Sequence, residues 1–161
     1  GTTVEYVSIY LKGNNVSKVV YKDAAENYFT TKKPKKILII GKGNEKRKVC
    51  HYVTKKEAPQ LRMGMTKHLG KGTWSSLPHP FELHPELGFE ECFFYLLKGG
   101  DGIQIGRGVW ADGEKVDSMW RIKDKTFATI PMGYHAVVGE PGVEVSYIWC
   151  YLAKKKHWEK I

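Results

Sequence analysis

Short stretches in which apolar and polar residues alternate fill most of the chain, and glycine or proline separates one stretch from the next. Alternation with a period of two is typical of β-strands, whose successive side chains point to opposite faces of a sheet. Many short strands, spaced roughly 8–12 residues apart, indicate an all-β sandwich or barrel. On this basis we expect strands at residues 4–11, 17–21, 37–40, 47–53, 61–68, 91–97, 103–110, 116–122, 126–130, 134–138 and 143–153.

The first 45 residues follow this pattern less regularly than the rest. Residues 23–29 are the best candidate for a short helix, for which Asp23 would supply the N-cap. A chain of 161 residues is long enough to bury one core. We therefore predict a single domain over residues 1–161, in which an N-terminal arm (1–45) precedes a barrel (46–161).

The formal net charge of +9 would suit a polyanionic partner. The lysines and arginines are scattered, however, with concentrations only at 32–36, 46–48 and 154–156. No recognition helix, zinc finger or aromatic RNA-binding signature accompanies them. We expect a solvated basic surface and no nucleic-acid partner, although the positive field could attract a small anionic substrate.

Features of membrane or secreted proteins are absent from the sequence. The longest aliphatic run, at 37–40, is far too short to span a membrane, and no signal-peptide pattern opens the chain. Cys50, Cys92 and Cys150 are odd in number and widely spaced, which argues against a disulfide framework. We therefore expect a cytoplasmic protein without a membrane partner.

Histidines and carboxylates gather in the segment 74–95. In an extended strand Glu82 and His84 share a face, and Glu91 begins the next predicted strand. His135 begins a strand further along the chain. Two imidazoles and two carboxylates on inward-facing walls would suit a divalent ion of Mn, Fe, Ni or Zn. The alternative is ordinary surface placement, which is more common for histidines in proline-rich loops.

Three motifs carry a resemblance to a known family: Trp-Ser-Ser at 74–76, Glu-Glu and an aromatic strand at 90–95, and Pro-Met-Gly-Tyr-His at 131–135. Over about residues 47–158 the chain resembles the C-terminal half of the 5-deoxy-glucuronate isomerase and 5-keto-4-deoxyuronate isomerase family. These enzymes belong to the cupin superfamily. The resemblance implies an all-β cupin fold, which is a double-stranded β-helix or jelly-roll barrel, with a short N-terminal extension. It also implies a homo-oligomer, most simply a dimer.

The family's first two metal ligands do not fall on two histidines here. If the family motif is aligned without gaps from Trp74, the positions of these two ligands fall on Pro80 and Glu82. A two-residue slip puts them on Glu82 and His84, which keeps the strand register, whereas a one-residue slip the other way selects His79 and Phe81. The resemblance thus implies a metal site of Glu82, His84, Glu91 and His135, and His79 is the alternative first ligand.

The implied activity is interconversion of the aldose and ketose forms of a sugar acid, as in inositol catabolism. Such a reaction needs a general base near neutral pKa, and His79 is the candidate catalytic residue if it is not a ligand. A bidentate arginine would suit the substrate carboxylate. Arg107 is the first candidate because its strand could line the barrel, and Arg62 and Arg121 are the alternatives.

Two other functions compete with an isomerase. The altered ligand pattern would also suit a non-catalytic cupin that binds a sugar or sugar acid, particularly since family members carry a second cupin-like half. Two histidines and a carboxylate would suffice for a cupin dioxygenase.

Overall fold

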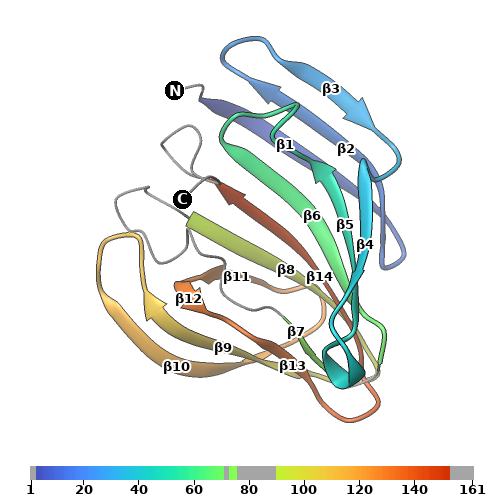
Figure 1. The fold of residues 1–161 in the computed structure, drawn as a ribbon, viewed down its shortest axis with the longest axis vertical. Coiled ribbons are helices and arrows are strands. Elements are labelled where there is room, and N and C mark those ends of the chain that lie inside the picture. Colours follow the sequence, from blue (N-terminus) through green and yellow to red (C-terminus); the bar gives the residue numbers. More distant parts are fainter. Residues whose placement is uncertain (1–2, 71–72, 76–89, 153–161) are drawn as a thin grey trace.

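A computed structural model describes residues 3–70, 73–75 and 90–152. The described chain is built of β-strands in three sheets, with one short 3-10 turn, η1 (Gly43–Glu45). The largest sheet lies in the middle, and a smaller sheet faces each of its sides (Figure 1). The all-β class predicted from the alternation is confirmed.

The central sheet contains six antiparallel strands in the order β11, β8, β14, β6, β5, β4. Their bounds are β4 (Lys36–Ile40), β5 (Arg47–Val53), β6 (Leu61–His68), β8 (Glu90–Lys98), β11 (Phe127–Ile130) and β14 (Glu144–Leu152). The β8–β14 ladder is unbroken from Glu144 opposite Lys98 to Leu152 opposite Glu90. β4 belongs to this sheet although it lies within the first 45 residues.

The second sheet closes the barrel on one side of the central sheet (Figure 1). Its strands run in the order β10, β9, β13, β7, and β12 pairs with β9. Their bounds are β7 (Trp74–Ser75), β9 (Gly102–Val109), β10 (Lys115–Ile122), β12 (Met132–Tyr134) and β13 (Val137–Gly139). Because β13 returns beside β9 rather than beside its sequence neighbour β14, the two sheets share one interior.

The third sheet covers the other side of the central sheet. It consists of β1 (Val4–Lys12), β2 (Asn15–Asp23) and β3 (Tyr28–Thr31) in sequential order. Val19 and Tyr21 of β2 belong to the same buried apolar cluster as Met63, Met65 and Ile148 of the central sheet. The N-terminal segment is therefore joined to the barrel by a common core.

The helix expected at 23–29 is wrong, because Asp23 stabilises a turn instead. One carboxylate oxygen accepts the backbone N–H groups of Ala25 and Asn27, and the other accepts the Tyr21 hydroxyl. Short polar side chains that bond nearby backbone groups compete with helix formation in this way. Glu26 adopts a φ of 62°, which reverses the chain so that β3 can pair with β2.

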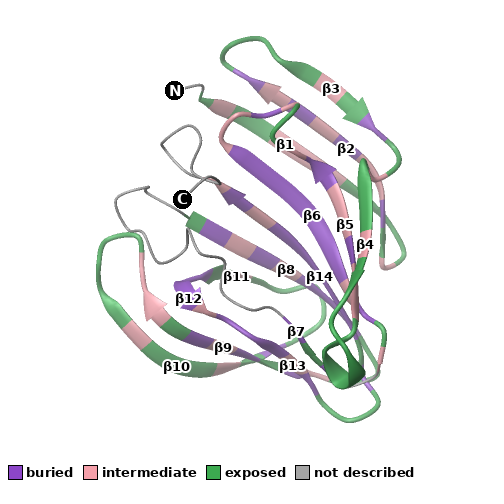
Figure 2. Cartoon of the chain, viewed as in Figure 1, coloured by how far each residue is buried: buried purple, intermediate pink, exposed green. Residues whose placement is uncertain are grey.

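Alternation along each central strand produces two buried faces with different partners. Phe93, Tyr95 and Trp149 belong to the cluster inside the barrel, whereas Leu96 and Ile148 belong to the cluster under the third sheet. Figure 2 shows buried residues along β6, β8 and β14 in the middle of the molecule. Among the described residues, no helix has the length and apolar character needed to span a membrane.

Candidate functional site

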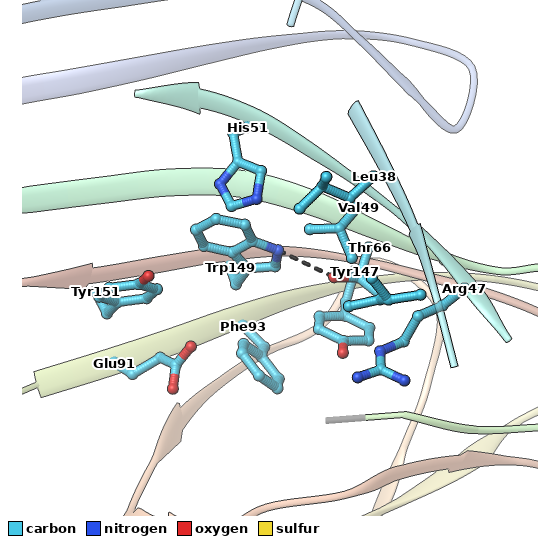
Figure 3. Close-up of a pocket in the computed structure, with 11 residues that line it drawn as sticks. Leu38, Arg47, Val49, His51, Thr66, Glu91, Phe93, Tyr147, Trp149 and Tyr151 are labelled. Carbon is cyan, nitrogen blue, oxygen red and sulfur yellow. Dashed lines mark hydrogen bonds between the residues drawn. The ribbon is translucent and has the colours of Figure 1, made fainter. Parts of the chain in front are cut away.

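A cavity of about 150 Å³ lies against the inner face of the central sheet. An aromatic wall lines it, together with polar side chains at both ends (Figure 3). The wall consists of Phe93 from β8 and Tyr147, Trp149 and Tyr151 from β14, which point to the same face because they alternate along their strands. The polar side chains are Arg47, His51, Thr66 and Glu91.

Trp149 occupies the middle of the wall because its strand neighbour is a glycine. A Cβ added to Gly64 would lie 2.2 Å from Cζ2 of Trp149, so any larger residue would displace the indole. The indole Nε1 donates a 3.0 Å hydrogen bond to Oγ1 of Thr66. Tyr151 stacks on Trp149 with 5.4 Å between the ring centroids. The result is a rigid apolar surface of the kind that packs against the carbon skeleton of a sugar.

Glu91 and His135 meet inside the barrel although 44 residues separate them in the sequence. Nε2 of His135 lies 3.5 Å from Oε2 of Glu91, and the two residues are only 0% and 6% exposed. Nδ1 of His135 donates a hydrogen bond of 2.7 Å to the carbonyl of Gly133, so in the neutral imidazole Nε2 keeps its lone pair. That lone pair faces the carboxylate.

The position of His135 depends on the close approach of β12 to β9. Gly133 has a φ of +115°, and a Cβ there would lie 2.6 Å from the carbonyl oxygen of Arg107. The buried Gln104 fixes the next turn, since its amide nitrogen donates a 2.8 Å bond to the carbonyl of His135. Tyr95 in turn donates a 2.6 Å bond to the Gln104 amide oxygen. Sequence reasoning did not identify Gln104 or Tyr95 as supports for the site.

A second polar group lies at the Arg47 end of the cavity. Ser75 of β7 is hydrogen-bonded both to Nε2 of His68 and, over 2.9 Å, to the hydroxyl of Tyr147. Burial, reinforced by the charge of Arg47, lowers the pKa of His68 to about 4, so this imidazole is neutral near pH 7. Burial raises the pKa of Tyr147 to about 12, so the phenol keeps its proton.

The structure brings together only some of the residues expected from the sequence. Glu91 and His135 lie side by side, as predicted. His79, Glu82 and His84 lie outside the described residues.

The candidate arginines lie elsewhere. Arg107 is exposed and ion-paired with Asp117, and it lines a separate hollow with Trp74 and Tyr134. Arg62 is buried and donates to the carbonyls of Ala58 and Leu61, while Arg121 pairs with Asp101 at the surface.

Arg47 was not singled out in the sequence, although a signal for it existed. Arg47, Val49 and His51 alternate within a predicted strand, so a common face for the three could be predicted. Alternation does not reveal which face is the inner one, and the structure shows that all three line the cavity.

The donor set fits part of a divalent metal site. A neutral imidazole nitrogen and a carboxylate oxygen face each other at 3.5 Å, and two acceptors in this arrangement repel unless a proton or a cation is shared between them. The Nδ1 bond to Gly133 is the outer contact that commonly orients a metal-binding histidine. Within the described ranges no group of three or more potential ligands gathers.

Comparison with known proteins places these features in context. A family model described as the KduI/IolB family matches residues 15–161. The 5-deoxy-glucuronate isomerase of Geobacillus kaustophilus (strain HTA426) is 26% identical over 125 residues, which are 75% of this chain and 45% of that protein. The corresponding protein of Bacillus subtilis (strain 168) is 28% identical over 92 residues, covering 55% of this chain and 34% of that protein. This chain thus spans less than half the length of either relative.

A solved structure shows the same fold. The crystal structure of an IolB-like protein from Salmonella typhimurium LT2 matches with a TM-score of 0.58 and 17% identity, over 76% of this chain and 48% of that one. Together with the two facing sheets, this match confirms the cupin barrel predicted from the sequence.

Proposed function

This chain belongs to the KduI/IolB family, and from that premise we propose that it isomerises a sugar acid of the 5-deoxy-glucuronate type between its aldose and ketose forms. The relatives named 5-deoxy-glucuronate isomerase support this proposal. The inferred setting is inositol catabolism in the cytoplasm, and the inferred assembly is a homodimer of single cupin domains. The pathway and the homodimer rest on the resemblance, whereas the cytoplasmic location rests on the widely spaced cysteines, which argue against a secreted disulfide framework.

The observation that carries the proposal is the buried pair of Glu91 and His135. A carboxylate and an imidazole with a fixed tautomer, facing each other beside an aromatic wall, can hold and orient the polar end of a sugar. We propose that Glu82 and His84 complete the metal site with this pair. A divalent ion of Zn, Mn, Fe or Ni held there would polarise the substrate carbonyl and offset the negative charge that develops during isomerisation.

The proton transfers require a base that reaches the carbon next to the carbonyl. His79 remains the proposed base, because an imidazole has an ordinary pKa near 6.5 and can both accept and return a proton near neutral pH.

Isomerisation in heavy water tests this function directly. Protein supplied with each of the four metals is incubated with 5-deoxy-glucuronate, and the products are followed by proton NMR. We expect interconversion and deuterium at the carbon next to the carbonyl. Glu91→Gln should lower the rate by about 100-fold or more, since it removes the carboxylate charge from the site.

Glu90→Gln is the matched control. It changes the adjacent residue of the same strand, whose side chain is exposed on the opposite face. If a metal-loaded protein binds sugar acids without exchanging deuterium, it is a non-catalytic binding cupin. Oxygen uptake on addition of a sugar acid would instead identify a dioxygenase.

A further inference from the structure

We infer that Arg47, at the end of the cavity remote from Glu91, binds the carboxylate of an anionic sugar and thereby selects sugar acids over neutral sugars. This inference deepens the proposed function and rests on it, because it assumes that the cavity receives the substrate. It assigns to Arg47 the role that the sequence suggested for Arg107.

Arg47 is anchored so that its guanidinium projects into the cavity. It is the first residue of β5 and points to the inner face, as do Val49 and His51 (Figure 3). Nη1 donates a 2.9 Å bond to the carbonyl of Glu45 in the preceding η1 turn. A guanidinium has five N–H donors in a rigid fork, so this anchor leaves donors for a bidentate carboxylate.

No carboxylate in the described part of the chain forms an ion pair with Arg47. Of the described residues that line the cavity, Glu91 alone carries a carboxylate, and Figure 3 shows it at the opposite end. Two polar side chains near Arg47 are uncharged, since burial keeps His68 neutral and Tyr147 protonated. A positive charge that no described carboxylate neutralises favours an anionic ligand in a partly enclosed cavity.

The polar groups at the two ends of the cavity are complementary to the groups at the two ends of a sugar acid. Arg47 matches a carboxylate at one end, and the carboxylate of Glu91, which lines the other end, can accept a hydrogen bond from a sugar hydroxyl group. The aromatic surface of Phe93 and Trp149 lies between them, where it would contact the carbon skeleton.

A basic hollow beside the cavity supports an anionic ligand independently. His51 and Tyr151 line both spaces, so the two adjoin each other. The second hollow has a volume of about 550 Å³, and its lining includes four lysines: Lys35, Lys36, Lys55 and Lys56. Clustered positive charge next to the cavity raises the local concentration of anions and speeds their association.

Calorimetric titration with two sugars that differ in charge tests the inference. D-glucuronate carries a carboxylate where D-glucose carries a hydroxymethyl group, so the pair isolates the charged contact. The wild-type protein should bind glucuronate more tightly than glucose. Arg47→Gln should weaken glucuronate binding by about 10- to 100-fold, the range expected when a hydrogen bond to a charged group is lost. Glucose binding should change less than about twofold, since the contact that is removed serves only the charged group.

Two further variants serve as controls. Arg47→Lys keeps the charge but loses the planar fork, so its glucuronate affinity should lie between those of the wild type and Arg47→Gln. Arg107→Gln removes an arginine from the separate outer hollow and should leave both affinities unchanged. Near-ultraviolet circular dichroism verifies that every variant retains the native packing of its aromatic side chains.

The outcomes separate this inference from the proposed function, because binding requires no turnover. Loss of glucuronate affinity in Arg47→Gln, in a protein that exchanges no deuterium, supports the inference and rejects the isomerase. Normal glucuronate affinity in Arg47→Gln rejects the inference, even if the protein is an isomerase. Equal weakening of both sugars, or a wild type that prefers glucose, also rejects it.

Discussion

The two faces of the central sheet are built from the same strands but serve different purposes. On β6, Met63 and Met65 point outward into the apolar cluster under the third sheet. Gly64, Thr66 and His68 alternate with them and point into the barrel, where Gly64 underlies Trp149 and His68 contacts Ser75. Adjacent residues of this strand therefore differ in whether they join the apolar cluster under the third sheet or the barrel interior, where polar side chains lie beside a second apolar cluster.

This difference follows from the cost of burying polar groups. An apolar face stabilises the fold in proportion to the area it removes from water, and it needs no specific partner. A buried polar side chain destabilises the fold unless it finds a hydrogen bond, so the inner face requires defined pairs such as Thr66 with Trp149. We therefore expect the outer face of β6 to respond mainly to the loss of apolar volume, and its inner face to respond also to pH and to the loss of single hydrogen bonds.

The largest expected effect is on the outer face. Met63 is fully buried, and Met63→Ala would leave a cavity between the central and third sheets. The free energy of unfolding should fall by about 2–5 kcal/mol, as for other large-to-small core substitutions. Urea denaturation followed by circular dichroism measures the loss, and sugar binding at the inner face should persist in the folded variant.

Met119→Ala is the control for this substitution. Met119 is 69% exposed on β10, so the same chemical change there should alter stability by less than about 0.5 kcal/mol. Similar losses in the two variants would contradict the placement of Met63 in an apolar core between the central and third sheets.

The second effect is a pH dependence that arises on the inner face. His68 has a folded-state pKa lowered to about 4 by burial, with Arg47 as the charged group nearby. The unfolded chain takes up this proton near pH 6.5 and the folded chain does not, so stability is complete above pH 6.5 and falls between pH 6.5 and 4. From pH 7.5 to pH 5 this single group should cost about 2 kcal/mol of unfolding free energy.

Denaturation of wild type and His68→Gln at both pH values isolates the histidine. Gln retains an amide that can bond Ser75 but does not titrate in this range. The variant should lose about 2 kcal/mol less than the wild type between the two pH values. An equal loss in both proteins would mean that His68 is not the source of the pH dependence.

A smaller effect tests a single inner-face hydrogen bond. Thr66→Val preserves the side-chain shape but removes the acceptor for Nε1 of Trp149, leaving a buried donor unpaired. We expect a loss of about 1 kcal/mol in the free energy of unfolding. Thr66→Ser keeps the hydroxyl, so denaturation of the two variants side by side should show the larger loss in Thr66→Val; the reverse order would contradict the importance of this bond.

The contrast between the two faces of the central sheet also explains how much of the structure could be predicted from the sequence. Alternation with a period of two predicted the strands because burial on one face leaves a repeating signal along the chain. Glu91 and His135 were assigned to one metal site from the motifs; the structure brings the two side chains together, and their role as ligands stays a prediction. The helix at 23–29 failed because the Asp23 side chain bonds nearby backbone groups in a turn as readily as it caps a helix.

The remaining features depend on strand register, which local sequence does not contain. The contact between Ser75 and Tyr147 joins residues 72 positions apart, and it exists only because β7 lies across the barrel from β14. Arg47 and Arg107 illustrate the same difficulty, since both occur in predicted strands. One points inward and the other outward, and a shift of one residue in either strand would exchange the two faces.

The smallest expected effect tests this distinction between the two arginines. Arg107 and Asp117 are directly paired on β9 and β10, with 3.3 Å between Nε and Oδ1. Their side chains are 69% and 75% exposed, so water screens the attraction and the coupling should be less than about 0.5 kcal/mol. A double-mutant cycle with Arg107→Gln and Asp117→Asn, followed by urea denaturation, measures this coupling free energy. A coupling above about 1 kcal/mol would exceed the range for exposed ion pairs. It would indicate that the outer hollow is organised around Arg107, which would weaken the assignment of the substrate carboxylate to Arg47 rather than to Arg107.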